Sequence, residues 1–147
     1  LGPQLVDELT GLLGHARVTV APVIDLAEQS AVNGYEHPQK VRERTLLRTV
    51  GDVFPHASAI SRSVDFDHPD PYKPNGPPGQ TGDHNAAPLG RRHHRAKTHL
   101  GYTCRQLGPG VYLWRTPHGL LRLVDRTGTY RLEATPPRAG PSPRGSR

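Results

Sequence analysis

The chain has 147 residues, enough for one domain, but only 33% of them are hydrophobic, and 16 are glycine and 16 proline. This composition predicts a small core and long irregular stretches. Lysine and arginine outnumber aspartate and glutamate by 19 to 13, a net charge of +6 that favours a polyanion such as nucleic acid, although an arginine-rich composition without such a partner explains it equally well. We see no signal peptide and no membrane-spanning apolar run, so we expect a cytoplasmic protein with no membrane partner.

Residues 1–36 are expected to be the remnant of a preceding domain and its linker. Four leucines at helical spacing predict an amphipathic helix over residues 4–13 that stops at Gly14. Alternating valines then predict a strand that Pro22 interrupts or places at a sheet edge. The chain begins at Leu1 and contains no methionine, which indicates a fragment with a missing N-terminal domain.

A second helix is predicted from Pro38, a residue favoured in the first helical turn, to a point near Gly51. Val41, Leu46 and Leu47 would form its apolar face. We expect a solvated face, rather than a binding face, for its three arginines, which are Arg42, Arg44 and Arg48.

The next predicted strand ends in VDFDH, where apolar and acidic residues alternate, so that one face is apolar and the other acidic. The proline-rich segment after His68 is predicted to be a surface loop. A short second strand should start at Asn85, and Pro88 can open a third helix that reaches Leu100. On this helix His93 falls on the apolar stripe with Leu89, Ala96 and Leu100. His94 projects from the neighbouring face, with Arg91 and Lys97 three residues to either side.

Residues 102–134 alternate in polarity between short turns, which predicts successive β-hairpins. Cys104, the single cysteine, excludes an intrachain disulfide and is expected to be a buried free thiol. Trp114 should pack within this sheet; a base-stacking role is the alternative. Residues 135–147, rich in proline, glycine and arginine, are expected to form a disordered basic tail.

Asp67 and His68 precede Asn85 and His94 by less than thirty residues, and this set suits a metal-assisted phosphodiesterase site. A carboxylate and a histidine hold a divalent cation, another histidine takes a proton from water, and neighbouring arginines hold phosphates.

This stretch resembles the HNH (ββα-metal) endonuclease motif. It is closer still to the C-terminal HNH module of a large actinobacterial endonuclease family whose N-terminal domain has no known function. The segments PVIDLAEQSAVNGYEHP, LLR, VFPH, DFDH, NAAPLGRRHHRAKTH and LGPGVYLWRTPHG are similar to that family in the same order, over roughly residues 16–130. The resemblance implies an α+β fold: a ββα-metal (HNH) module over residues 37–101, flanking helices, a C-terminal β-hairpin region and much irregular loop.

The resemblance also implies a function, the divalent-metal-dependent hydrolysis of DNA phosphodiester bonds. His68 would be the general base, and Asn85 would fix the loop by hydrogen bonds from its amide. Asp67 and His94 would hold one divalent ion, Mg²⁺ or Mn²⁺ by the oxygen-rich shell, with Zn²⁺ or Ni²⁺ also admitted by the imidazole. The DNA phosphates would be contacted by Arg91, Arg92, Arg95 and Lys97.

The chain departs from that family at its zinc knuckle. The knuckle cysteines would fall at Asp52, Ala57, Val64 and Gly90, and none of these is cysteine, so structural zinc is not expected. His93, the knuckle's fourth ligand, becomes a predicted core histidine. His84 and His99 are expected at the surface, with an accessory-ligand role as the alternative for His99. Two alternatives to the active nuclease remain: a degenerate, non-catalytic HNH-like fragment that binds nucleic acid, and a fragment that folds only beside its missing domain.

Overall fold

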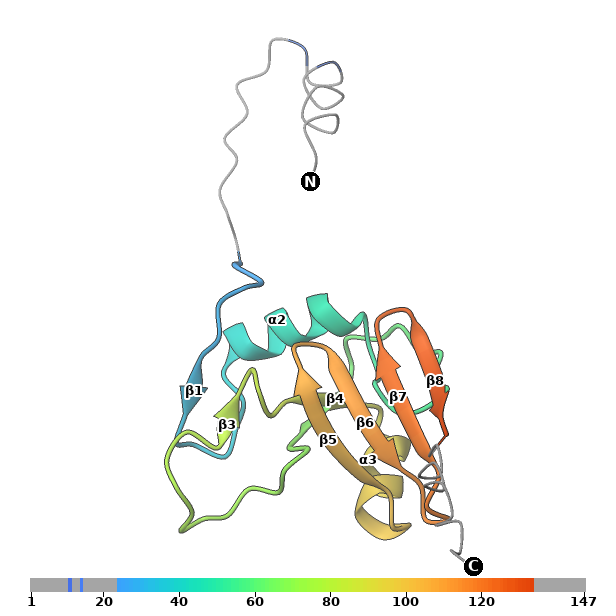
Figure 1. Ribbon diagram of the computed structural model, residues 1–147. Coiled ribbons are helices and arrows are strands. Elements are labelled where there is room, and N and C mark those ends of the chain that lie inside the picture. The colour runs from blue at the N-terminus through green and yellow to red at the C-terminus, as the bar shows by residue number, and fades with distance from the viewer. Residues whose placement is uncertain (1–10, 12–13, 15–23, 134–147) are drawn as a thin grey trace, which may run out of the picture.

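The computed structural model describes residues 11, 14 and 24–133, and this part of the chain has an α+β fold with antiparallel sheets (Figure 1). Apart from residue 11, the helix predicted over residues 4–13 lies outside the described residues, as do the strand at Pro22 and the tail 135–147. The elements are β1 (Ala31–Val32), α2 (Gln39–Thr49), β2 (Asp65–Asp67), β3 (Thr81–Gly82), β4 (Ala87–Leu89), α3 (Arg91–His99), β5 (Thr103–Gly108), β6 (Val111–Arg115), β7 (Leu121–Asp125) and β8 (Gly128–Leu132).

The strands form three antiparallel sheets. β1 pairs with β3, β2 pairs with β4, and β5 to β8 form a four-stranded meander in chain order. The meander confirms the β-hairpins predicted after residue 102. Figure 1 shows α2 and α3 at opposite ends of this arrangement, and both helices contact β4. None of the described helices has the length and apolar character needed to cross a membrane.

The core lies between β4 and the meander. Tyr112 and Trp114 are fully buried there, and the Tyr112 hydroxyl donates a 2.7 Å hydrogen bond to the carbonyl of Ala86. The base-stacking alternative for Trp114 is therefore wrong, because no face of its ring is open to a ligand. Cys104 is a buried free thiol, as predicted, and burial raises its pKa. The buried residues of this core are Val53, Ala87, Leu89, Cys104, Tyr112, Trp114 and Val124.

Helix α2 buries a different face from the one its apolar residues predict. Val41 and Leu46 are buried as expected, but Leu47 is 47% exposed. The prediction of a solvated arginine face is wrong for Arg44, which is only 1% exposed, and for Arg48, whose side chain is 8% exposed. The reason is a buried carboxylate, Asp83, that lies opposite this face of the helix.

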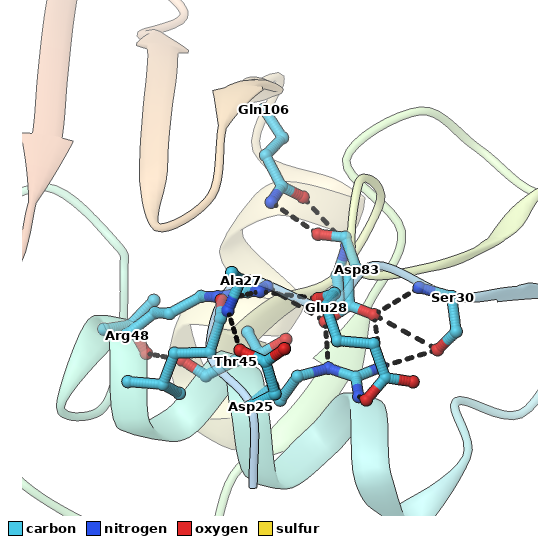
Figure 2. A network of polar contacts seen from close by, with 12 residues as sticks. Asp25, Ala27, Glu28, Ser30, Thr45, Arg48, Asp83 and Gln106 are labelled. Carbon is cyan, nitrogen blue, oxygen red and sulfur yellow. Dashed lines mark hydrogen bonds and ion pairs between the residues drawn. The ribbon is translucent and has the colours of Figure 1, made fainter.

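Asp83 joins three parts of the chain (Figure 2). Arg44 donates to both of its carboxylate oxygens, at 2.8 and 2.7 Å, and Arg48 donates to Oδ1 at 2.9 Å. The backbone amide of Ser30 donates to Oδ2 at 2.9 Å, and Gln106 donates from β5 to the Asp83 carbonyl. The residue thereby ties α2, the segment before β1 and the meander to the turn that follows β3.

Burial alone would raise the pKa of the Asp83 carboxyl group, but the hydrogen bonds from Arg44 and Ser30, together with the charges of Arg44 and Arg48, outweigh burial and lower it. A depressed pKa means that this carboxylate stabilises the fold above its unfolded pKa, near 3.9, and that the contribution is lost as pH falls through the lower folded value. The backbone beside it is equally close-packed. A Cβ at Gly82 would overlap the carbonyl oxygen of Ser30, so glycine is required where β3 pairs with β1.

Asp52 fixes the start of α3. Its Oδ2 accepts the amide hydrogen of Gly90 at 2.9 Å and lies 2.6 Å from Nδ1 of His93, while its Oδ1 accepts the amide hydrogen of Phe54. The Phe54 ring stacks on His93 at 4.3 Å. His93 is turned towards the fold, but its side chain is 30% exposed and is held by an acid, so the prediction of a core histidine is only partly right. Leu100, predicted on the same apolar stripe, is 61% exposed. Pro88 lies in β4 and does not open the helix, which begins at Arg91.

Arg44→Met should lower the free energy of unfolding by about 3 kcal/mol, because Asp83 stays buried and loses the guanidinium that bonds both of its oxygens. Urea denaturation measures this loss. Arg105→Met, an exposed arginine on β5, is the matched control and should change stability little. Equal denaturation midpoints for the two variants would contradict the role given to Asp83.

Candidate functional site

The candidate site lies where β2 meets α3. β2 pairs with β4 in antiparallel register, Asp65 opposite Leu89 and Asp67 opposite Ala87, and α3 follows β4 after a single residue. Alternate residues of a strand point to opposite faces. Asp65 and Asp67 accordingly face α3, whereas Phe66 lies on the other side, near His37 and beneath the Arg42 guanidinium.

His94 lies between the two acidic side chains of β2. Its Nε2 is 3.6 Å from Asp67 Oδ1, and its Nδ1 is 3.2 Å from Asp65 Oδ2. An ionised carboxylate only accepts hydrogen bonds, so the contact with Asp65 favours the ring form that carries its hydrogen on Nδ1. That form turns the free electron pair of Nε2 towards Asp67.

The Asp67–His94 separation suits two ligands of one metal ion. Ligand atoms that each lie about 2.0–2.2 Å from a metal are roughly 3–4 Å apart, and the observed 3.6 Å falls within this range. Three or more His, Cys, Asp or Glu side chains do not gather into a metal-binding group anywhere in the described part of the chain. The pair would therefore need other ligands, such as water or substrate oxygen, to complete a shell.

Lys97 is placed differently from the phosphate contact that the sequence predicts. Its side chain is 13% exposed, and its ammonium lies 2.5 Å from Asp67 Oδ2 and 2.7 Å from the carbonyl oxygen of His68. The contact with Asp67 is an ion pair without the direction of a hydrogen bond. Lys97 thus links two consecutive residues at the end of β2 and turns its charge inward.

The arginines of α3 remain at the surface. Arg91, Arg92 and Arg95 are all exposed, and Arg91 also makes a 3.2 Å ion pair with Asp65. His99 and His84 are exposed too, in agreement with the sequence. The outward face of α3 is therefore basic beside the acidic end of β2.

His68 follows β2 and is only 5% exposed. Its Nε2 lies 2.8 Å from the hydroxyl of Thr81, and its ring lies 4.4 Å from that of His37. Burial, and next the neighbouring His37, lower the pKa of His68 to about 4. The imidazole is therefore neutral at pH 7. Tyr35 and Tyr72 pack against the same ring at 5.3 and 5.6 Å.

Asn85 braces the long loop from inside the fold. Its side-chain amide donates to the carbonyls of Asp70 and Gln80 at 2.9 Å each, and its Oδ1 accepts the Asp70 amide hydrogen at 2.8 Å. His37 contacts the Asn85 carbonyl at 2.9 Å. The hydrogen bonds expected from the amide of Asn85 are present, and they close the loop that begins at His68.

Sequence reasoning missed several residues that shape this site. Asp65 was signalled by its place two residues before Asp67 in the DFD alternation, which puts both on one strand face. His37 and Thr81, which contact His68 from other segments, gave no local signal. Of the four positions compared with a zinc knuckle, Asp52 and Gly90 lie together beside His93.

Comparisons of this chain with protein-family models, with curated proteins and with solved structures found no match.

Lowering the pH should destabilise the protein through His68. Its folded pKa of about 4 lies below the unfolded value near 6.5, so the unfolded chain binds the proton first, and stability falls as pH drops from 6.5 towards 4. His68→Gln should flatten this dependence in denaturation experiments across that window. His99→Gln, an exposed ring, should keep the parent's slope. An unchanged slope in His68→Gln would show that His68 is not held neutral by the fold.

Proposed function

We propose that this protein is a divalent-metal-dependent endonuclease of the HNH (ββα-metal) type that hydrolyses DNA phosphodiester bonds. The observation that carries the proposal is the 3.6 Å approach of Asp67 Oδ1 to His94 Nε2 across β2 and α3. β2 and α3 supply these atoms, β4 pairs with β2 and leads into α3, and the basic face of α3 lies directly beside them. This arrangement agrees with the resemblance seen in the sequence.

Asp67 and His94 would hold the metal ion. The residues fit such an ion: Asp67 Oδ1 lies 3.6 Å from Nε2 of His94, and Asp65 turns that nitrogen towards the carboxylate, while Asp67 Oδ2 lies against Lys97. One carboxylate and one imidazole suit Mg²⁺ or Mn²⁺ and also admit Zn²⁺ or Ni²⁺. A bound ion would supply electrostatic stabilisation of the charge that develops on the phosphate.

His68 would accept the proton of the attacking water. When the Thr81 hydroxyl accepts a hydrogen from Nε2, the free electron pair is on Nδ1, and burial keeps the ring neutral at pH 7. Tyr35, Tyr72 and His37 confine the ring, so little reorientation is needed. Asn85 would act on this step indirectly, by closing the loop that follows His68.

DNA phosphates would bind the exposed arginines of α3. Arg91, Arg92 and Arg95 share the helix that carries His94, so the phosphate they hold is next to the proposed ion. Such contacts position the substrate without reading its sequence. Lys97 would instead neutralise Asp67 from inside the fold.

A second candidate is a non-catalytic module that binds nucleic acid, and Lys97 is the observation that favours it. Its ammonium already lies 2.5 Å from Asp67 and holds the end of β2 in place. A resident cation reduces the need for a metal ion there and opposes its binding by charge repulsion. The two candidates differ in whether DNA is cut once it is bound.

The parent chain should nick supercoiled plasmid in Mn²⁺ and lose this activity in chelator. His68→Ala should lower the rate by about 10²–10⁴-fold, the usual contribution of a general base, and leave Mn²⁺ affinity nearly unchanged. Asp67→Ala should lower both the nicking rate and the Mn²⁺ affinity. Equal cleavage by His68→Ala and the parent would contradict the proposal. A parent chain that binds DNA in Mn²⁺ but does not nick it would favour the second candidate.

Asp65→Asn should weaken Mn²⁺ binding by about 10–100-fold, because the amide no longer enforces the ring form that directs Nε2 of His94 at the metal. Calorimetric titration measures the affinity. Arg91→Ala removes the other ion-pair partner of Asp65 and serves as the control, which should keep the parent's affinity within a few-fold. Equal affinities for Asp65→Asn and the parent would exclude this orienting role.

A further inference from the structure

A groove of about 350 Å³ runs along β2 on the side away from β4. This volume falls within the range of about 300–1,000 Å³ that is usual for small-molecule sites. His94 and Arg91 line the groove from α3, and Arg42 from α2. The groove therefore adjoins the proposed metal site through His94. Its full lining is Tyr35, Glu36, His37, Arg42, Val64, Asp65, Phe66, Arg91 and His94.

Tyr35 presents a fixed aromatic ring to this groove. The residue is 65% exposed, an unusual position for a large aromatic side chain, yet its ring is braced on two sides. His68 lies 5.3 Å away at a shallow angle, and Tyr72 meets it edge-on, also at 5.3 Å. Tyr72 is itself tied by a 2.9 Å hydrogen bond to the carbonyl of Asn33. A flat ring held in this way stacks on a planar ligand with little loss of side-chain entropy.

Arg42 gives the groove an available positive charge. Its guanidinium lies 5.0 Å from the centre of the Phe66 ring, and no carboxylate among the described residues pairs with it. Arg91, by contrast, is already paired with Asp65. Glu36 is the remaining acid of the groove and is exposed. Of the lining charges, then, Arg42 favours a phosphate and Glu36 opposes one.

We infer that this groove binds the nucleotide adjacent to the cleaved phosphate, with its base stacked on Tyr35 and its phosphate held by Arg42. The inference rests on the proposed function. A paired base in duplex DNA is covered on both faces by its neighbours, so only an unstacked base reaches the ring. The groove thus selects single-stranded or locally melted DNA over intact duplex.

Binding measured in chelator tests this subsite separately from cleavage. The probe is a single-stranded oligonucleotide that carries 2-aminopurine, whose fluorescence is quenched by stacking, with a duplex of the same sequence as competitor. The full chain should bind the single strand more tightly. Tyr35→Ala should weaken single-strand binding roughly 5- to 150-fold, as expected for the loss of one base–aromatic stack. Tyr35→Phe should keep the parent's affinity, because it keeps the ring.

Four further variants sharpen the result. Tyr130→Ala removes another exposed tyrosine, 46% exposed on β8, and should change nothing. Arg42→Gln should weaken single-strand binding, and Glu36→Gln should tighten it. Tyr35→Leu, which keeps apolar bulk beside His68 but has no flat ring, should lose affinity as Tyr35→Ala does.

The inference is overturned if the parent does not bind the single strand, if it prefers duplex, or if Tyr35→Leu and Tyr35→Ala both keep the parent's affinity and fluorescence quenching. Loss of metal-dependent nicking in the parent, with this binding pattern intact, would overturn the proposed endonuclease and leave the subsite standing. Intact nicking by the parent, with Tyr35 variants that bind the single strand as the parent does, would overturn the subsite and leave the proposed endonuclease standing.

Discussion

The buried ion pairs of Asp83 with Arg44 and Arg48 hold together parts of the chain that share little apolar surface. Asp83 lies in the turn between β3 and β4. Two residues before it, Thr81 contacts His68, and two residues after it, Asn85 closes the loop. β4 follows at once and pairs with β2. The placement of both halves of the candidate site therefore depends on the position of this one turn.

Carboxylates take on further internal roles in this protein. Asp52 holds the start of α3, and Asp65 and Asp67 face His94 from β2. A chain that is only 33% hydrophobic relies on such polar contacts where a larger core would otherwise fix the elements. The surface charge changes as a result. Several of the chain's 13 acidic residues are turned inward, while Arg91, Arg92 and Arg95 stay exposed on α3. The basic character of that helix follows from this division.

Local patterns in the sequence predicted the parts of the fold that depend on neighbours in the chain. Alternation and turn residues gave the meander, and the DFD alternation placed Asp67 on an acidic strand face. Contacts between distant segments were not readable in the same way. Arg44 and Asp83 are 39 residues apart, so the burial of that arginine was missed, and so was the exposure of Leu47 on the same helix. For the candidate site, the approach of Asp67 to His94 followed from the motif, but the inward turn of Lys97 did not.

Paramagnetic broadening by Mn²⁺ shows whether Asp67 and His94 together bind a metal ion. The imidazole resonances of the histidines are followed by NMR while Mn²⁺ is added in amounts well below the protein concentration. If Asp67 and His94 do so, the His94 signals broaden first and those of His84 and His99, both exposed, persist. In Asp67→Ala the selectivity for His94 should disappear. Equal broadening of all exposed histidines in the parent chain, or the same response in Asp67→Ala, would rule out a metal site formed by Asp67 and His94.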